Sequence, residues 1–313
     1  MLLGKEELFI SKLLKQWSKV GILVSIGLLF AGALIWAGHT FEKRHSKNSN
    51  YNMSAIPTIM MHGWSSSLRA EEPLIKTAAD NRIITEEVVI HVTKANKLKV
   101  QGKLTGKKNN PIILVQFDNN RVGEFRYARG LHRIVKYLQK EYDLEKFNVI
   151  GHSMGSYAWA YYALRWGADP ALPQLNKMVL LAGPYDGILN KGHANQPTNG
   201  ELAGLWDDSP RANTLGKNGK PKIIHDEYKV LLKRRDDFPK NARVLNIYGD
   251  LEDGTDSDGL VSVPSARSLR YLVEKRAKSY EEYKVEGQQG QHSNLHIDNE
   301  EVSKEITNYL WKK

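Results

Sequence analysis

The chain has 313 residues, of which 41% are hydrophobic and 26% are charged, so its composition indicates neither global disorder nor a polytopic membrane protein. The formal net charge is +10, but the lysines and arginines are spread along the chain without a nucleic-acid-binding motif. We therefore predict a solvated basic surface and no nucleic-acid partner. The absence of cysteine excludes disulfides, thiolate metal sites and a cysteine nucleophile.

The N-terminal region predicts a membrane anchor. Residues 1–19 are basic, and residues 20–37 (VGILVSIGLLFAGALIWA) form an uncharged run that is just long enough to cross a bilayer as a helix. The basic leading segment predicts a cytoplasmic N-terminus and a single-pass protein in the cell membrane, with the remaining chain outside the cytoplasm. The alternative is a signal peptide cleaved after small residues near the end of the run, which would give a secreted protein. Residues 38–53 are polar and predict a linker, so the folded domain is expected over residues 54–313.

Within that domain, the sequence predicts strands and helices along the whole chain. Apolar or alternating runs predict strands at 55–61, 83–92, 97–104, 112–117, 147–150, 177–181, 243–248 and 283–286. Helices are expected at 72–80, 131–142, 157–166, 227–235, from 265 onward, and at 299–310. Residues 186–240 are mostly irregular, and such a long segment is uncommon unless it is functional. We predict that it caps a substrate cleft, with a passive surface insertion as the alternative.

The central motif is Gly151-His152-Ser153-Met154-Gly155, which lies between the predicted strand 147–150 and the predicted helix 157–166. The pattern G-x-S-x-G at such a junction is typical of a nucleophile elbow, where glycines relieve crowding and the serine hydroxyl projects above the sheet. Ser153 is therefore the candidate nucleophile. The alternative is a serine that only caps a helix.

A serine nucleophile needs an imidazole to remove its proton and a carboxylate to orient that imidazole. After an elbow of this kind the expected chain order is serine, acid, histidine. Asp258 and His292 satisfy the order, each in a loop that follows a predicted strand, and Asp253 and His296 are the alternatives. The acidic loop does not match the calcium-loop pattern, so we predict no metal site and no cofactor.

The negative oxygen of a tetrahedral intermediate needs preorganised donors. We expect the backbone amide of Met154, at the start of a helix, and that of Trp64, in the turn His62-Gly63-Trp64 after the first strand, to form this oxyanion hole. The turn on its own would equally suit a simple strand end. His152, beside the nucleophile, is expected to pack and not to act as the base.

Together these motifs resemble the α/β-hydrolase superfamily and, more narrowly, the bacterial DUF915 group of secreted or membrane-anchored hydrolases, which are distantly similar to lipases and esterases. The resemblance covers residues 54–313 and rests on His62-Gly63-Trp64, the elbow, Tyr248-Gly249 with Ser257-Asp258-Gly259-Leu260-Val261, and His292-Ser293-Asn294-Leu295-His296. It implies an eight-stranded, mostly parallel sheet with helices on both faces. Three serines follow Trp64 where such loops frequently carry glycines. The resemblance therefore predicts the nucleophile but not the shape of the acyl pocket.

The sequence thus predicts a membrane-anchored serine hydrolase that cleaves a small-molecule or lipid carboxylic ester through an acyl-enzyme without a cofactor. One alternative is an acyltransferase or amidase that uses the same triad. Another is a surface-binding protein that keeps the fold without catalysis.

Overall fold

The computed structural model describes residues 50–190 and 203–313. The predicted basic N-terminus and membrane segment lie outside the described residues, as does nearly all of the predicted linker, and the predicted cap is described except for 191–202. Within the described ranges, no helix is both long and apolar enough to cross a membrane.

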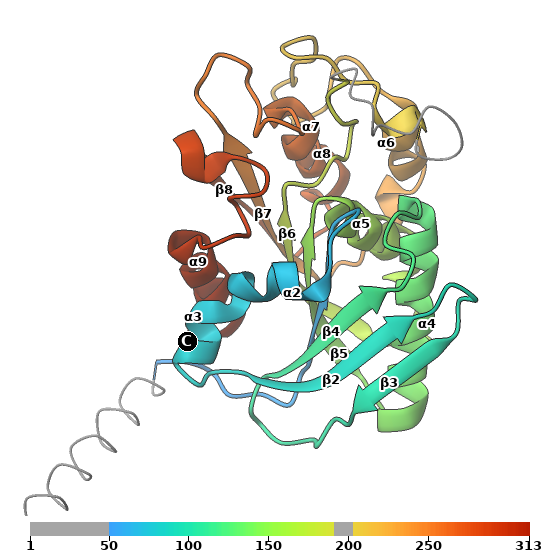
Figure 1. The fold of residues 1–313 in the computed structure, drawn as a ribbon. Helices are drawn as coiled ribbons and strands as arrows, with labels where there is room; N and C mark the ends of the chain where they lie inside the picture. Colours follow the sequence, from blue (N-terminus) through green and yellow to red (C-terminus); the bar gives the residue numbers. More distant parts are fainter. Residues whose placement is uncertain (1–49, 191–202) are drawn as a thin grey trace, which may run out of the picture. The chain divides into compact units, whose positions relative to one another are not determined.

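The predicted eight-stranded, mostly parallel sheet is confirmed, with the strand order β3-β2-β4-β1-β5-β6-β7-β8 (Figure 1). Among the strands of the described residues, only the edge strand β3 runs antiparallel to its neighbour, β2. The strands are β1 Thr58–Met61, β2 Thr85–Val92, β3 Leu98–Gly102, β4 Pro111–Phe117, β5 Lys146–His152, β6 Gln174–Leu181, β7 Arg243–Asp250 and β8 Ser279–Glu286. The helices are α2 Leu68–Glu71, α3 Lys76–Asp80, α4 Glu124–Tyr142, α5 Met154–Trp166, α6 Asp226–Leu232, α7 Val263–Arg267, α8 Leu269–Val273 and α9 Glu300–Trp311, with short 3-10 turns at Glu72–Ile75, Ala203–Leu205, Arg235–Asp237 and Gly287–Gly290.

The central strands are largely buried because helices cover both faces of the sheet. β4, with the sequence PIILVQF, is buried at every position except Gln116. Parallel sheets between two helix layers read as continuous apolar runs in this way. Helices α4 and α5 lie on one face and α3 and α9 on the other (Figure 1).

Two helices differ from their predicted bounds. α4 begins at Glu124, seven positions before the expected start, because Tyr127 and Ala128 already pack in the core directly after Gly123. The helix expected at 72–80 is a series of short turns that begins at Leu68 and contains Pro73 at the start of its 3-10 part. Proline lacks the amide hydrogen that a continuous helix would use, so the segment is interrupted there.

The parallel arrangement brings several loops together at the carboxyl ends of the strands. β1, β5, β7 and β8 run in the same direction, so their carboxyl ends lie on the same side. The loops that follow these four strands hold the residues singled out in the sequence, and ligand sites of open α/β sheets form at these carboxyl ends.

Candidate active site

Ser153 occupies the sharp turn between β5 and α5. Its φ of 53° and ψ of −121° place a non-glycine residue in a region that is normally avoided, which is a strained conformation. A side chain at Gly151 would place its Cβ 2.8 Å from the carbonyl carbon of Gly155, and one at Gly155 would come 2.7 Å from the carbonyl oxygen of His62. The two glycines of the motif are therefore required by close backbone approach.

His292 contacts both other candidate residues. Its Nε2 lies 3.0 Å from Oγ of Ser153, and its Nδ1 lies 2.7 Å from Oδ2 of Asp258. Because a carboxylate only accepts, Nδ1 carries the hydrogen and Nε2 is free to accept the serine proton. The structure thus brings Ser153, His292 and Asp258 into one continuous chain of polar contacts.

Asp258 is fixed by its own loop. The side chain is buried, and its Oδ1 accepts hydrogen bonds from the amides of Leu260 and Val261 at 2.8 and 2.7 Å. The alternative acid, Asp253, accepts from the amide and hydroxyl of Thr255 in an exposed part of the loop. The geometry favours Asp258 as the partner of His292.

The alternative base, His296, faces a different group. Its Nδ1 lies 2.9 Å from the carbonyl oxygen of Ala70 and 3.3 Å from Oε2 of Glu71. Burial and the neighbouring charge of His152 lower the pKa of His296 to about 4, so the ring is neutral near pH 7. Its geometry matches a core histidine that orients a loop.

The predicted oxyanion-hole residues border the same space as the nucleophile. Trp64 and Met154 line a cavity of about 490 Å³ together with Ser153 and His292. Within the described ranges, no hydrogen bond from the amide of Trp64 or Met154 is found, whereas the amide of Ser65 donates to a carbonyl. Both amides are therefore available to an acceptor in the cavity.

Apolar side chains form one part of the remaining cavity wall, and polar residues, among them Ser65, Asn120 and Ser293, form the other. Trp206 meets Trp64 edge to face, with ring centroids 5.7 Å apart. Other apolar lining residues are Ile188, Leu260, Val261 and Ile297. Ile188 and Trp206 come from the segment predicted to be a cap, so the described part of that segment contributes directly to the cavity wall.

Glu71 is a buried residue that sequence reasoning missed. Its Oε1 accepts hydrogen bonds from the amide of Gly63 at 3.3 Å and from the hydroxyl of Ser66 at 3.1 Å, and it lies 3.3 Å from Nδ1 of His152. With the contact to His296, one carboxylate joins the loop after β1, the elbow and the loop after β8. Each of these three segments carries a predicted site residue.

His152 has acceptors on both ring nitrogens, namely the Glu71 carboxylate and the carbonyl oxygen of His292, the latter 3.3 Å from Nε2. Both nitrogens can donate only if the ring is protonated. Burial opposes this charge, but the adjacent carboxylate raises the pKa of His152. Burial likewise works to raise the pKa of Glu71, and the charge and hydrogen bond of His152 outweigh it and lower that pKa to about 2. The pair is therefore ionised, which goes beyond the packing role expected for His152.

Comparison with known proteins gives the family. The profile described as "Alpha/beta hydrolase of unknown function (DUF915)" matches residues 45–313. The chain belongs to the DUF915 family of α/β-hydrolases. No curated protein matches the sequence.

Two solved structures share the fold of this DUF915 protein. The lin2722 gene product of Listeria innocua is 23% identical, with a TM-score of 0.66 over 82% of this chain and 93% of that one. A protein of Lactobacillus plantarum WCFS1, provisionally named a cell surface hydrolase, is 22% identical, with a TM-score of 0.60 over 81% of this chain and 88% of that one. At these identities the likeness shows the fold, and the resemblance predicted from the sequence is confirmed.

Two groups of described residues are close enough to hold a metal ion. Glu71, His152 and His296 form the first group. Both ring nitrogens of His152 are already occupied, one by Glu71 and the other by the carbonyl of His292, and a protonated imidazole does not bind metal. The second group, which lies in the segment between β6 and β7, consists of Asp207, His225 and Glu227.

Proposed function

We propose that this DUF915 protein is a serine hydrolase that cleaves carboxylic esters, with Ser153 as nucleophile, His292 as base and Asp258 as the acid that orients it. The observation that carries the proposal is the pair of contacts made by His292, 3.0 Å to the Ser153 hydroxyl and 2.7 Å to the Asp258 carboxylate. Membership of the α/β-hydrolase family supports a hydrolase. The contacts of His292 add a nucleophile within reach of a base.

The steps follow from this arrangement. His292 takes the proton of Ser153 through Nε2 as the oxygen attacks the ester carbonyl carbon, and Asp258 stabilises the imidazolium. The carbonyl oxygen becomes negative and is bound by the amides of Trp64 and Met154. The intermediate collapses when His292 returns the proton to the leaving alcohol, which leaves an acyl group on Ser153. Water then repeats the sequence and releases the acid.

The cavity favours an ester with an apolar acyl part. Its volume of about 490 Å³ and its two tryptophans, Trp64 and Trp206, would bury such a group, and volumes of this order are usual for small-molecule sites. The described cap residues Ile188 and Trp206 support a role of segment 186–240 in covering this acyl site.

The test is a panel of p-nitrophenyl esters of increasing chain length, run on the full-length protein and on Ser153→Ala, together with labelling by a fluorophosphonate probe. We expect the variant to lose both turnover and labelling. Ser279→Ala is the matched control, because Ser279 begins β8 and so lies at the end of the strand far from the site loops. This variant should keep both turnover and labelling. Turnover that survives in Ser153→Ala refutes the nucleophile, and an unlabelled wild type that still binds esters indicates a non-catalytic binding protein.

An alcohol acceptor added to the same assay separates hydrolysis from acyl transfer, because transfer would convert the acceptor into a new ester while hydrolysis releases free acid. Amide substrates test the amidase alternative in parallel. We expect free acid to be the main product.

We further propose that residues 20–37 anchor the hydrolase domain, residues 54–313, to the outer side of the cell membrane. The uncharged run supports this location, and the Lactobacillus plantarum relative is named for the cell surface. Cell fractionation tests it: the full-length protein should be recovered with membranes, and recovery of the uncleaved chain entirely in the soluble fraction would contradict the anchor.

A further inference from the structure

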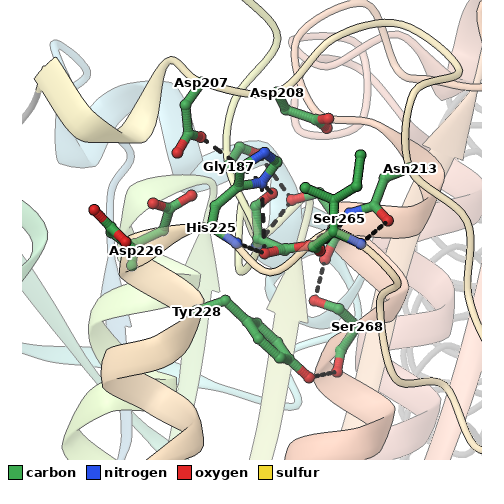
Figure 2. Close-up of polar contacts among 12 residues, drawn as sticks. Gly187, Asp207, Asp208, Asn213, His225, Asp226, Tyr228, Ser265 and Ser268 are labelled. Atoms are coloured by element: carbon green, nitrogen blue, oxygen red, sulfur yellow. Dashed lines mark hydrogen bonds and ion pairs between the residues drawn. The ribbon is translucent and has the colours of Figure 1, made fainter.

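A second cluster of charged side chains lies in the segment between β6 and β7, outside the candidate active site. Asp207, His225 and Glu227 each offer one ligand atom, and these atoms all lie within 4.8 Å of one another. Figure 2 shows the carboxylate of Asp207 beside the ring of His225, and Nδ1 of that ring is 3.8 Å from Oδ1 of Asp207. None of the three is among the residues that line the cavity at Ser153.

Glu227 is the unusual member of this cluster. The residue is 6% exposed, and both of its carboxylate oxygens are buried with no amide, hydroxyl or cationic donor from any other described residue, so that their polar contact is the carboxyl group of Asp207. A side chain at Gly187 would place its Cβ 3.0 Å from Oε1 of Glu227 and 2.6 Å from Oδ1 of Asp207. The two carboxylates therefore border the same small space. Buried carboxylate oxygens normally have a donor or a cation, so this space is where one is expected.

The imidazole is held in the way that metal-binding histidines usually are. Nδ1 of His225 lies 2.9 Å from the carbonyl oxygen of Asp186, and its backbone amide donates to Oδ1 of the same residue at 2.9 Å. Asn213 in turn donates to Oδ2 of Asp186 at 2.8 Å. Donation by Nδ1 to this carbonyl fixes the ring, so Nδ1, which is also the atom 3.8 Å from Asp207, is not the ligand, and the cation would be bound through Nε2.

The balance of charge also favours a cation. The carboxylates of Asp207 and Glu227 border the same small space, with ligand atoms within 4.8 Å of each other, so their negative charges repel. Lys229 does not neutralise them, because its ammonium pairs with the exposed Asp226 at 2.8 Å. A bound cation would supply the positive charge that the two carboxylates lack.

We propose that Asp207, His225 and Glu227 bind one divalent cation of the class that combines imidazole with carboxylate ligands, of which Zn²⁺ is the representative. Three protein ligands and a water give the four-coordinate arrangement that Zn²⁺ adopts. Ca²⁺ would require six or more oxygens. This inference departs from the sequence analysis, which predicted no metal ligand, and it does not depend on the proposed esterase activity.

The ion would fix one wall of the cavity. Trp206 precedes the ligand Asp207, and Ile188 follows Gly187, and both Trp206 and Ile188 line the cavity. The two segments are also joined by backbone hydrogen bonds, from the amide of Ile188 to Leu205 and from the amide of Asp208 to Ile188. A cation on Asp207 and Glu227 would tie this pair of segments to α6, so its role is structural.

The test begins with full-length protein that has been stripped of metal with a chelator. Zn²⁺ binding is then measured by isothermal titration calorimetry, and the bound metal is counted by metal analysis after dialysis. We expect one ion per chain and a midpoint of thermal unfolding that rises with Zn²⁺. Glu227→Gln and Asp207→Asn should each weaken binding by at least about tenfold. Asp226→Asn is the matched control, since its exposed carboxylate pairs with Lys229, and it should bind as the wild type does.

Asp207 is exposed, so Asp207→Asn is expected to fold normally. If Glu227→Gln fails to fold, Asp207→Asn still tests the site. Absence of saturable Zn²⁺ binding by the wild type would overturn the proposal and leave a proton shared between the two carboxylates as the explanation. Equal binding by the wild type and Asp207→Asn, or tighter binding of Ca²⁺ than of Zn²⁺, would overturn the site or the class of ion.

Discussion

Replacing Glu71 with glutamine tests whether the buried ion pair stabilises the loops around the candidate active site. The residue is fully buried, and its pKa falls from an ordinary 4.5 to about 2, so the folded protein favours the carboxylate by about 3 kcal/mol. Glutamine keeps the shape but removes the charge that His152 needs. We expect the free energy of unfolding to fall by about 3 kcal/mol, within the range for breaking a buried pair. In a domain of this size the midpoint of thermal unfolding should fall by roughly 6–12 °C.

The effect of Glu71→Gln should depend on pH. The pKa of Glu71 is lowered, so its stabilisation is present above about pH 4.5 and is lost as pH falls toward about 2. The pKa of His152 is raised, so its stabilisation is present below about pH 6.5 and is lost as pH rises through the raised value. The difference in unfolding free energy between wild type and variant should therefore be largest between about pH 4.5 and 6.5.

Equilibrium urea unfolding of both proteins across pH measures this difference directly. Glu72→Gln is the matched control, because Glu72 is the next residue and its salt bridge is with the exposed Arg69, so its loss should cost at most about 0.5 kcal/mol. If Glu71→Gln is no less stable than Glu72→Gln, or if their difference is the same at every pH, the ion-pair argument is wrong.

Two further changes concern catalysis. Asp258→Asn should lower kcat for a p-nitrophenyl ester by about 10³–10⁴ while KM changes little, because His292 would then be held in the wrong tautomer; steady-state kinetics measure this. Gly63→Ala would place a Cβ 3.2 Å from Cβ of Ser153, and the shift this forces next to the nucleophile should lower kcat by at least about tenfold in the same assay, with circular dichroism unchanged.

Asp253→Asn is the control for the acid, since its carboxylate contacts Thr255 in the exposed loop and the change should leave kcat within about twofold. A loss of activity in Asp253→Asn as large as that in Asp258→Asn would contradict the assignment of the acid. For Gly63→Ala, unchanged kcat would show that the close approach to Ser153 has no consequence for the reaction.

The sequence predicts those parts of the fold that depend on local pattern. β4 is buried on both faces, and a strand in that position must be apolar at nearly every residue, so its sequence is recognisable. The elbow is likewise local, because Gly151 and Gly155 are required by backbone atoms only a few residues away or on the neighbouring strand. For the same reason the candidate nucleophile could be named before its partners.

The partners of Ser153 are harder to predict because they come from distant loops. Spacing favoured His292 over His296, but only the fold shows that one ring reaches the serine and the other reaches Ala70. The sequence contains no pattern that indicates the burial of Glu71 beside His152. A glutamate in a short helix is normally exposed, and its burial depends on contacts with His152, 81 positions later in the chain.

The three serines that follow Trp64 depart from the glycines frequent in related loops, and their contacts explain how this loop is held without glycine. Ser65 takes a φ of 60°, its amide donates to the carbonyl of Asn120, and its hydroxyl accepts from Arg121. The hydroxyl of Ser66 donates to Glu71. A glycine could supply the backbone angle but not these side-chain contacts. The hydroxyls of Ser65 and Ser66 thus anchor the loop at two points next to Trp64. These bonds hold the backbone there while the amide of Trp64 itself stays free among the described residues, which is the rigidity that a preorganised oxyanion donor requires.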